Sequence, residues 1–173
     1  MKKLAIAVSV SLLALLPFVG LQASSDSRSS SSKGKNTFNT RLIGYNEVPS
    51  ASTEASGRFR AKVNRADEMI SYRLRYENLE APVLFAHIHL GQKDANGGVS
   101  AFLCGGGNTD PCPQEGVVTG VIEPADVIGP EAQGIAPGEF DELVRAMKAG
   151  VTYANVHSEL FPGGEIRGQI HKR

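Results

Sequence analysis

Apolar and polar residues alternate along much of the chain with a period of two, the pattern of a strand with one buried face. The two clearest runs, residues 58–63 and 70–77, are separated by a short polar segment. This order predicts an antiparallel hairpin with one face in the core and one in water. Gly and Pro clusters separate six further strand candidates, at residues 36–43, 84–90, 98–103, 117–122, 152–157 and 165–170. The whole pattern predicts an all-β sandwich or barrel.

One segment departs from this alternation. Between residues 138 and 149, apolar residues recur at helical spacing: Phe140, Leu143, Val144 and Met147. Acidic residues near the start, basic residues near the end and Gly150 directly afterwards are typical of a helix that ends there. We therefore predict one short amphipathic helix near residues 138–149, and a single turn at residues 124–127.

The first 23 residues have the composition of a secretory signal peptide. Lys2 and Lys3 precede an apolar run at residues 4–16, and Ala23 offers a small residue for cleavage before Ser24. A retained membrane anchor is the alternative, but the apolar run is shorter than the ~20 residues that a spanning helix needs. The sequence predicts a signal peptide at residues 1–23, no transmembrane segment after its removal, and a secreted or periplasmic protein.

The remaining chain divides into a tail and a body. Residues 24–36 are Ser-rich with almost no apolar side chains, which predicts a disordered linker. Residues 37–173 suffice for one domain with one core. Without the signal peptide the chain has two more acidic than basic residues, so its net charge gives no reason to expect nucleic acid or an anionic membrane as partner. We expect an unknown extracytoplasmic partner or small ligand.

The two cysteines, Cys104 and Cys112, enclose a short segment that begins with three glycines. In an exported protein an even number of cysteines is most simply paired, and the glycines let the chain turn back. A metal–thiolate site is the competing interpretation, but the spacing is not that of a C-x-x-C pair. A disulfide closing this loop would stabilise the fold by about 2.5 kcal/mol in the chain-entropy model.

Three histidines are candidate metal ligands. His87 and His89 are two residues apart on a predicted strand, so their side chains share one face. Two imidazoles placed in this way can bind one ion at ~2.0–2.1 Å, as in zinc and copper sites. His157 ends another predicted strand, and it would complete a three-histidine copper or zinc site if the two strands lay together. The alternative is that these histidines are hydrogen-bonded structural residues.

Polar residues near His157 are candidates for supporting this site: Asn155, Glu165 and Arg167. A carboxylate such as Glu159 or Glu165 could orient the imidazoles by hydrogen bonding. Glu165 and Arg167 also fall on one face of a predicted strand, either as a solvated face or as an ion pair buried beneath the histidines. The pattern favours a structural ion pair over catalysis, because a nearby Arg keeps a carboxylate ionised.

Four motifs, in this order, resemble the signatures of the CHRD domain family, first described in chordin: Asn46-Glu47-Val48-Pro49, Ala86-His87-Ile88-His89-Leu90-Gly91, Tyr153-Ala154-Asn155-Val156-His157-Ser158 and Pro162-Gly163-Gly164-Glu165-Ile166-Arg167-Gly168-Gln169. The resemblance extends from about residue 37 to residue 171. It implies an immunoglobulin-like antiparallel β-sandwich, which agrees with the alternation, but no defined activity. The insertion between the cysteines resembles the bacterial exported branch of the family.

The second motif, residues 86–91, is also similar to the copper-ligand strand of copper/zinc superoxide dismutases, which are β-sandwiches too. The rest of that ligand set, including a bridging histidine, has no counterpart in this chain. Three hypotheses for function follow. The first is a non-enzymatic exported module that binds a copper or zinc ion or a partner. The second is a copper-dependent redox enzyme, and the third is a structural adhesion or matrix domain.

Overall fold

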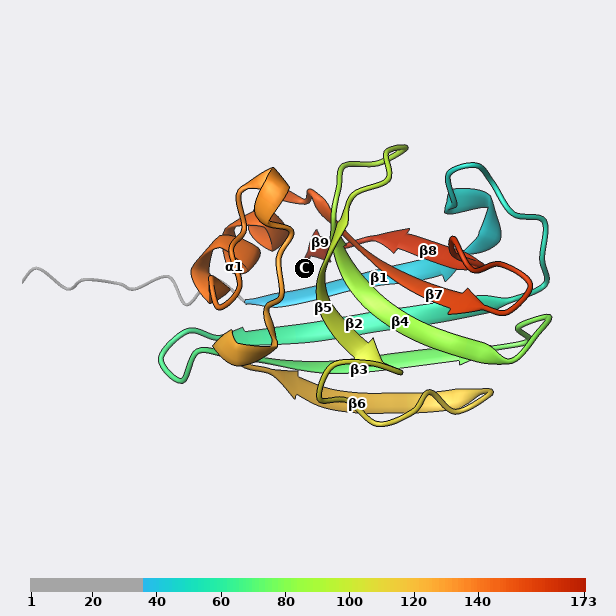
Figure 1. Cartoon of the computed structure of the whole chain (residues 1–173), viewed down its shortest axis with the longest axis horizontal. Helices are drawn as coiled ribbons and strands as arrows, with labels where there is room; N and C mark the ends of the chain where they lie inside the picture. Colours follow the sequence, from blue (N-terminus) through green and yellow to red (C-terminus); the bar gives the residue numbers. More distant parts are fainter. Residues whose placement is uncertain (1–35) are drawn as a thin grey trace, which may run out of the picture. The chain divides into compact units, whose positions relative to one another are not determined.

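The computed structural model describes residues 36–173, so the predicted signal peptide and nearly all of the predicted linker lie outside the described residues. The body is built from strands with one α-helix, α1 (Phe140–Ala149) (Figure 1). The strands are β1 (Thr37–Ile43), β2 (Ser56–Asn64), β3 (Met69–Glu77), β4 (Val83–Leu90), β5 (Gly98–Cys104), β6 (Gly116–Ile122), β7 (Thr152–Ser158), β8 (Ile166–Gln169) and β9 (His171–Lys172). All eight strands predicted from the sequence are present, and β9 is added to them.

The strands form one antiparallel sheet in the order β5-β4-β7-β8-β1-β2-β3-β6, with β9 also paired to β1. The sheet curls, so that β4, β5 and β7 lie across β1, β2 and β3 (Figure 1), and the edge strands β5 and β6 contact each other. The Tyr72 hydroxyl on β3 donates a hydrogen bond to the Leu103 carbonyl on β5 at 2.7 Å, joining the two layers. The all-β prediction is confirmed, and the two layers are one sheet that nearly closes into a barrel.

The predicted hairpin is formed by β2 and β3. Phe59 lies opposite Leu74 on the inner face, where both are fully buried, and Arg60 lies opposite Arg73 on the outer face, where both are exposed. The inner faces of both layers supply the core, in which Phe38, Ile88 and Ile166 are also buried. Period-2 alternation therefore identified which residues face the core.

Helix α1 lies at one end of the barrel (Figure 1) and buries its apolar stripe there: Phe140, Leu143, Val144 and Met147. It ends at Gly150, whose φ of 73° is the left-handed conformation that glycine adopts without strain. The prediction of a short helix in this region is confirmed, and a 3-10 turn occupies Pro124–Asp126. No helix among residues 36–173 is long and apolar enough to cross a membrane.

Cys104 and Cys112 form a disulfide with their Cα atoms 5.0 Å apart, as predicted. Gly105 and Gly107 adopt positive φ angles of 80° and 57°, which the tight return of the loop requires. The disulfide begins at the last residue of β5, so it anchors the loop that leads away from this edge strand.

Candidate metal centre

The three histidines come from two neighbouring strands. His87 and His89 lie on β4, and His157 lies on β7, which pairs antiparallel with β4. In the register, Phe85 lies opposite His157 and His87 lies opposite Asn155, so His157 is diagonal to His87 on the same face. The sequence placed His87 and His89 on one face, and the pairing of β4 with β7 brings His157 to them.

This face is the outer face of the sheet, yet the histidines are buried. Ile88, between them in sequence, points into the core, whereas His87, His89 and His157 are on the opposite side and only 5%, 7% and 5% exposed. Aromatic rings close the site from the sides: Phe102 packs edge-on against His87 at 4.5 Å between ring centroids, and Phe85 packs against both His87 and His157. The site is therefore a polar cluster enclosed by side chains.

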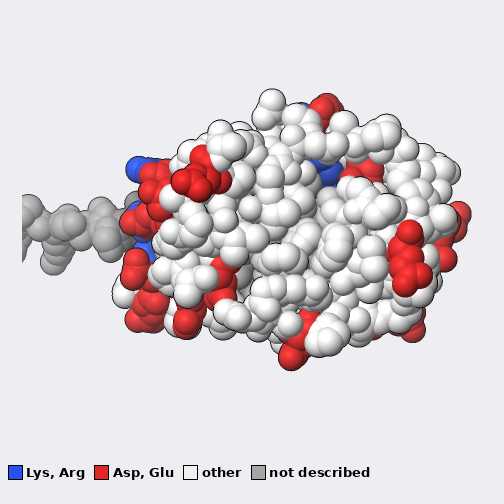
Figure 2. Space-filling model, viewed as in Figure 1, with Lys and Arg blue, Asp and Glu red and all other residues white. Residues whose placement is uncertain are grey.

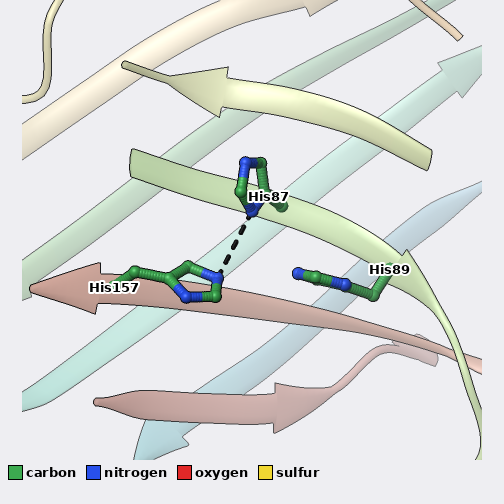
Figure 3. A group of neighbouring side chains, drawn as sticks. All are labelled: His87, His89 and His157. Atoms are coloured by element: carbon green, nitrogen blue, oxygen red, sulfur yellow. Dashed lines mark hydrogen bonds between the residues drawn. The ribbon is translucent and has the colours of Figure 1, made fainter. Parts of the chain in front are cut away.

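The imidazoles point toward one another (Figure 3), and one ring nitrogen from each lies within 4.8 Å of the others. His87 Nδ1 lies 3.3 Å from His157 Nε2. Two nitrogens of a tetrahedral site with bonds of ~2.0–2.1 Å would be separated by about 3.3–3.4 Å. The His87–His157 pair therefore already has this spacing, whereas the other nitrogens, within 4.8 Å of one another, must move closer to share an ion. The predicted three-histidine cluster is present.

Backbone carbonyls set the orientation of two of the rings. His89 Nδ1 is 3.1 Å from the Gly97 carbonyl, and His157 Nδ1 is 3.0 Å from the Pro162 carbonyl. A carbonyl only accepts, so each Nδ1 carries the hydrogen and each Nε2 keeps its lone pair. The Nε2 lone pairs of His89 and His157 are therefore directed into the cluster (Figure 3), where that of His157 accepts a hydrogen bond from His87 Nδ1. For His87 Nδ1 to bind an ion, its proton must move to Nε2. A carbonyl partner of this kind typically orients a metal-binding histidine.

Burial also determines the charge of the cluster. It lowers the pKa of His87 to about 3, where His157 and His89 add to the effect, and the pKa of His89 to about 4 despite the bond to Gly97. It lowers the pKa of His157 as well, against the bond to Pro162. Neutral imidazole is the form that binds a metal. His87 Nε2 and His89 Nε2 are both buried without a hydrogen-bond partner among the described residues, so each is a polar atom whose burial is uncompensated there.

Tyr153 and Arg167 form a stack on one side of the cluster. The Tyr153 ring lies parallel to His89 with 4.7 Å between ring centroids, and the Arg167 guanidinium carbon is 3.4 Å from the centre of the Tyr153 ring. Arg167 is 2% exposed and donates to three acceptors, the Asn96 side chain and the carbonyls of Gln92 and Ala95. Arg167 thus connects the stack to the loop whose Gly97 carbonyl orients His89.

Tyr153 was not predicted from the sequence, although it is on the same face of β7 as Asn155 and His157. Its period-2 spacing from these two residues is the signal that could have found it. Glu47 was likewise given no role from the sequence. It is buried and accepts a hydrogen bond from the Asn155 amide at 2.6 Å. Burial raises the pKa of Glu47 to about 7, although the bond to Asn155 and the charge of Arg167 oppose the change.

Gly164 lies against this Glu47–Asn155 pair. Its φ is 129°, and a Cβ atom there would lie 2.7 Å from the Asn155 amide nitrogen and 2.8 Å from Glu47 Oε1. Any other residue would therefore strain the backbone and collide with the pair. This close approach explains why a glycine is needed at the end of the Pro-Gly-Gly turn.

Glu165 forms no hydrogen bond with the three histidines. It is fully buried and accepts hydrogen bonds from the Thr53 hydroxyl, the Glu80 backbone amide and the Ser158 hydroxyl. It also forms no ion pair with Arg167, so the buried Glu–Arg pair considered for this strand is not formed. The reason is that Glu165 precedes β8 and turns toward Thr53 and Ser158, whereas Arg167 turns toward residues 92–96. Of the predicted polar residues, Asn155 and Arg167 lie beside the cluster and Glu165 stabilises the turn.

Comparison with known proteins places this site in a family context. The family model described as the CHRD domain matches residues 38–170, which is most of the chain and includes all three histidines. No match was found among curated proteins or among solved structures. Because the family model covers almost the whole body described above, the chain belongs to the CHRD domain family.

Proposed function

We propose that this chain is an exported, non-enzymatic CHRD-domain protein that binds one copper or zinc ion through His87, His89 and His157. The single observation that carries the proposal is the arrangement of donor atoms. Two imidazoles are oriented by backbone carbonyls so that unprotonated Nε2 atoms enter the same space, and the third lies 3.3 Å from one of them. Imidazole ligands suit both zinc and copper, and a tetrahedral site favours zinc.

Export is supported by the disulfide between Cys104 and Cys112, since disulfides persist mainly outside the cytoplasm. The composition of residues 1–23 supports it independently. Outside the cytoplasm, a cluster of neutral imidazoles meets copper or zinc without competition from the thiol-rich reducing pool.

Binding is favoured over redox catalysis by the enclosure of the cluster. Three histidines leave one coordination position for water or another ligand, as catalytic metal sites do. A redox enzyme also needs a path for its small substrate, and here the imidazoles are at most 7% exposed and flanked by Phe85 and Phe102. The copper-dependent redox enzyme and the structural matrix domain therefore become outcomes that the following experiment separates.

The experiment is metal titration of the purified mature protein, after removal of metal by a chelator, with Zn²⁺ and Cu²⁺ in separate calorimetric runs. We expect one equivalent to bind. His87→Gln, His89→Gln and His157→Gln should each lower the affinity at least 100-fold, since removal of even an outer-shell partner typically costs 10- to 100-fold. His171→Gln is the matched control, because His171 is exposed at β9 and should leave binding unchanged.

Thermal unfolding of each variant without metal checks that the fold is retained. Metal at 100 times the dissociation constant should stabilise the wild type by about 2.7 kcal/mol and leave the three cluster variants unaffected. Absence of binding in the wild type would overturn the proposal and favour the structural domain. A loss of metal affinity in His171→Gln equal to that in the three cluster variants would also overturn it. Superoxide dismutation by the copper-loaded protein, lost in the same three variants, would replace the non-enzymatic role with the redox one.

A further inference from the structure

The outer face of β1, β2 and β3 presents a dense array of cations, none of which belongs to the metal cluster. Six exposed side chains form what we call the basic face: Arg41, Arg58, Arg60, Lys62, Arg73 and Arg75. Among the outward positions of these three strands the only acidic residue is Glu77, at the end of β3, which pairs with Arg75 at 3.0 Å. The face is therefore strongly positive although the whole chain is electrically balanced.

The arginines are directly paired across the strands. Arg58 lies opposite Arg41 on one side and Arg75 on the other, and Arg60 lies opposite Arg73. Neighbouring strands are ~4.7–4.9 Å apart and alternate residues of one strand ~6.6–6.8 Å apart, so the cations form a regular grid. Like charges directly opposite one another destabilise a sheet. An anion that bridged neighbouring guanidinium groups would relieve this repulsion.

The guanidinium groups are also available to a ligand. Ion pairs among residues 36–173 involve Arg65, Arg75 and Arg145, so the other cations of the basic face have no acidic partner there. The face seen in Figure 2, by contrast, displays acidic groups at its margins and few Lys or Arg side chains. Positive charge is thus concentrated on one side of the sheet.

Two adjoining grooves run along this face. One, of about 490 Å³, is lined by five of the six cations together with Glu77. The next, of about 770 Å³, is lined in part by Arg58, Arg60, Arg73, Lys62 and Arg173. Because three arginines line both, the grooves form one continuous track with cations along its length. Such a track fits an extended ligand that carries several anionic groups.

We propose that the basic face binds an acidic polysaccharide, through salt bridges between its guanidinium groups and regularly spaced carboxylate or sulfate groups. Arg binds such planar or tetrahedral oxyanions with two parallel hydrogen bonds, which a point charge does not provide. The outward positions of β1, β2 and β3 carry no aromatic residue, and Phe38 and Tyr72, which also line the second groove, are only 1% and 7% exposed. Single-stranded nucleic acid would call for aromatic stacking platforms, and a membrane for inserted apolar side chains, so a polar polymer is the better fit. The proposal does not depend on the metal cluster.

The test uses the full mature protein with heparin and polygalacturonate as probes, one sulfated and one bearing carboxylates alone. We expect binding that weakens as the NaCl concentration rises. The variant R58Q/R60Q/R73Q should lower the affinity at least tenfold, because it removes the three cations shared by both grooves. Preference for one probe identifies the anionic group, and binding of either supports the proposal.

The matched control is R65Q/R145Q/K148Q, which removes the same charge from exposed positions elsewhere on the domain and should change the affinity less than twofold. Thermal unfolding should show that R58Q/R60Q/R73Q is as stable as the wild type or more stable, since repulsion is relieved. If that variant fails to fold, R58Q and R73Q are measured singly, and each should lower the affinity about threefold. Equal losses in both triple variants, no binding to either polysaccharide, or tighter binding to phosphatidylglycerol vesicles or to oligo(dT) would overturn the proposal.

Discussion

Replacing Glu47 with Gln tests how the protein tolerates a buried carboxyl beside the histidine cluster. Glu47 is 6% exposed, and its Oε1 accepts a hydrogen bond from Asn155. Burial raises its pKa from 4.5 to about 7. The folded protein therefore keeps the proton at pH values where the unfolded chain has released it. Raising the pH from about 4.5 to about 7 therefore favours the unfolded state. Over this range the contribution of the protonated Glu47 carboxyl to the free energy of unfolding is lost.

The size of the effect follows from the shift. One pKa unit corresponds to about 1.4 kcal/mol, so ionisation of Glu47 costs the folded state about 3 kcal/mol by pH 8. A Gln at this position cannot ionise, and its amide oxygen can still accept the hydrogen bond from Asn155. Glu47→Gln should therefore match the wild type near pH 4 and exceed its free energy of unfolding by about 2–3 kcal/mol at pH 8.

Urea unfolding at pH 4, 6 and 8 measures this difference, with equal m-values showing that the same structure unfolds. Subtracting the two proteins at each pH cancels every other titrating group. Glu159→Gln serves as the control, because that side chain is exposed and should leave the difference near zero at all three pH values. A Glu47→Gln protein that is no more stable than the wild type at pH 8 would refute the reasoning, since the buried carboxyl would then have no cost of ionisation.

Two further outcomes are expected. Replacing Cys104 and Cys112 together with Ser should lower the free energy of unfolding by about 2.5 kcal/mol in urea titration, and the wild type should lose the same amount on reduction; unequal losses would mean that the substitution disturbs packing as well. Arg167→Met should lower it by about 3 kcal/mol or more, because carbonyls in the 92–95 segment lose a charged donor. Hydrogen exchange should then quicken in residues 91–97 before other loops, and uniform exchange across the domain would contradict this local role.

The strands and the helix could be predicted from the sequence because their signals are local. In β2 and β3 every second residue is buried, so apolar and polar residues alternate in the sequence, and this alternation is visible without knowledge of the partner strand. The same parity placed His87 and His89 on one face. Parity could not decide between the roles considered for Glu165, because residues at the junction of a turn and a strand need not keep the parity of the strand that follows.

The histidine cluster shows where local signals end. His157 is 70 residues from His87, and only the pairing of β4 with β7 brings their rings together. The groups that orient His89 and His157 are the backbone carbonyls of Gly97 and Pro162. Since every residue has a backbone carbonyl, the sequence does not reveal which ones take this role. The burial that lowers the histidine pKa values likewise comes from segments distant in sequence.

By itself, then, the sequence determined the all-β class, the short helix, the cysteine pair and the identity of the three candidate ligands, since these depend on composition and short-range periodicity. Only the tertiary structure decided that the ligands converge, that Tyr153 and Arg167 stack beside them, and that balanced charges separate into a basic face on β1, β2 and β3. Net charge sums over the chain without regard to position. Strand register sets the distances between the charges, and the electrostatic interaction between neighbouring groups depends on those distances.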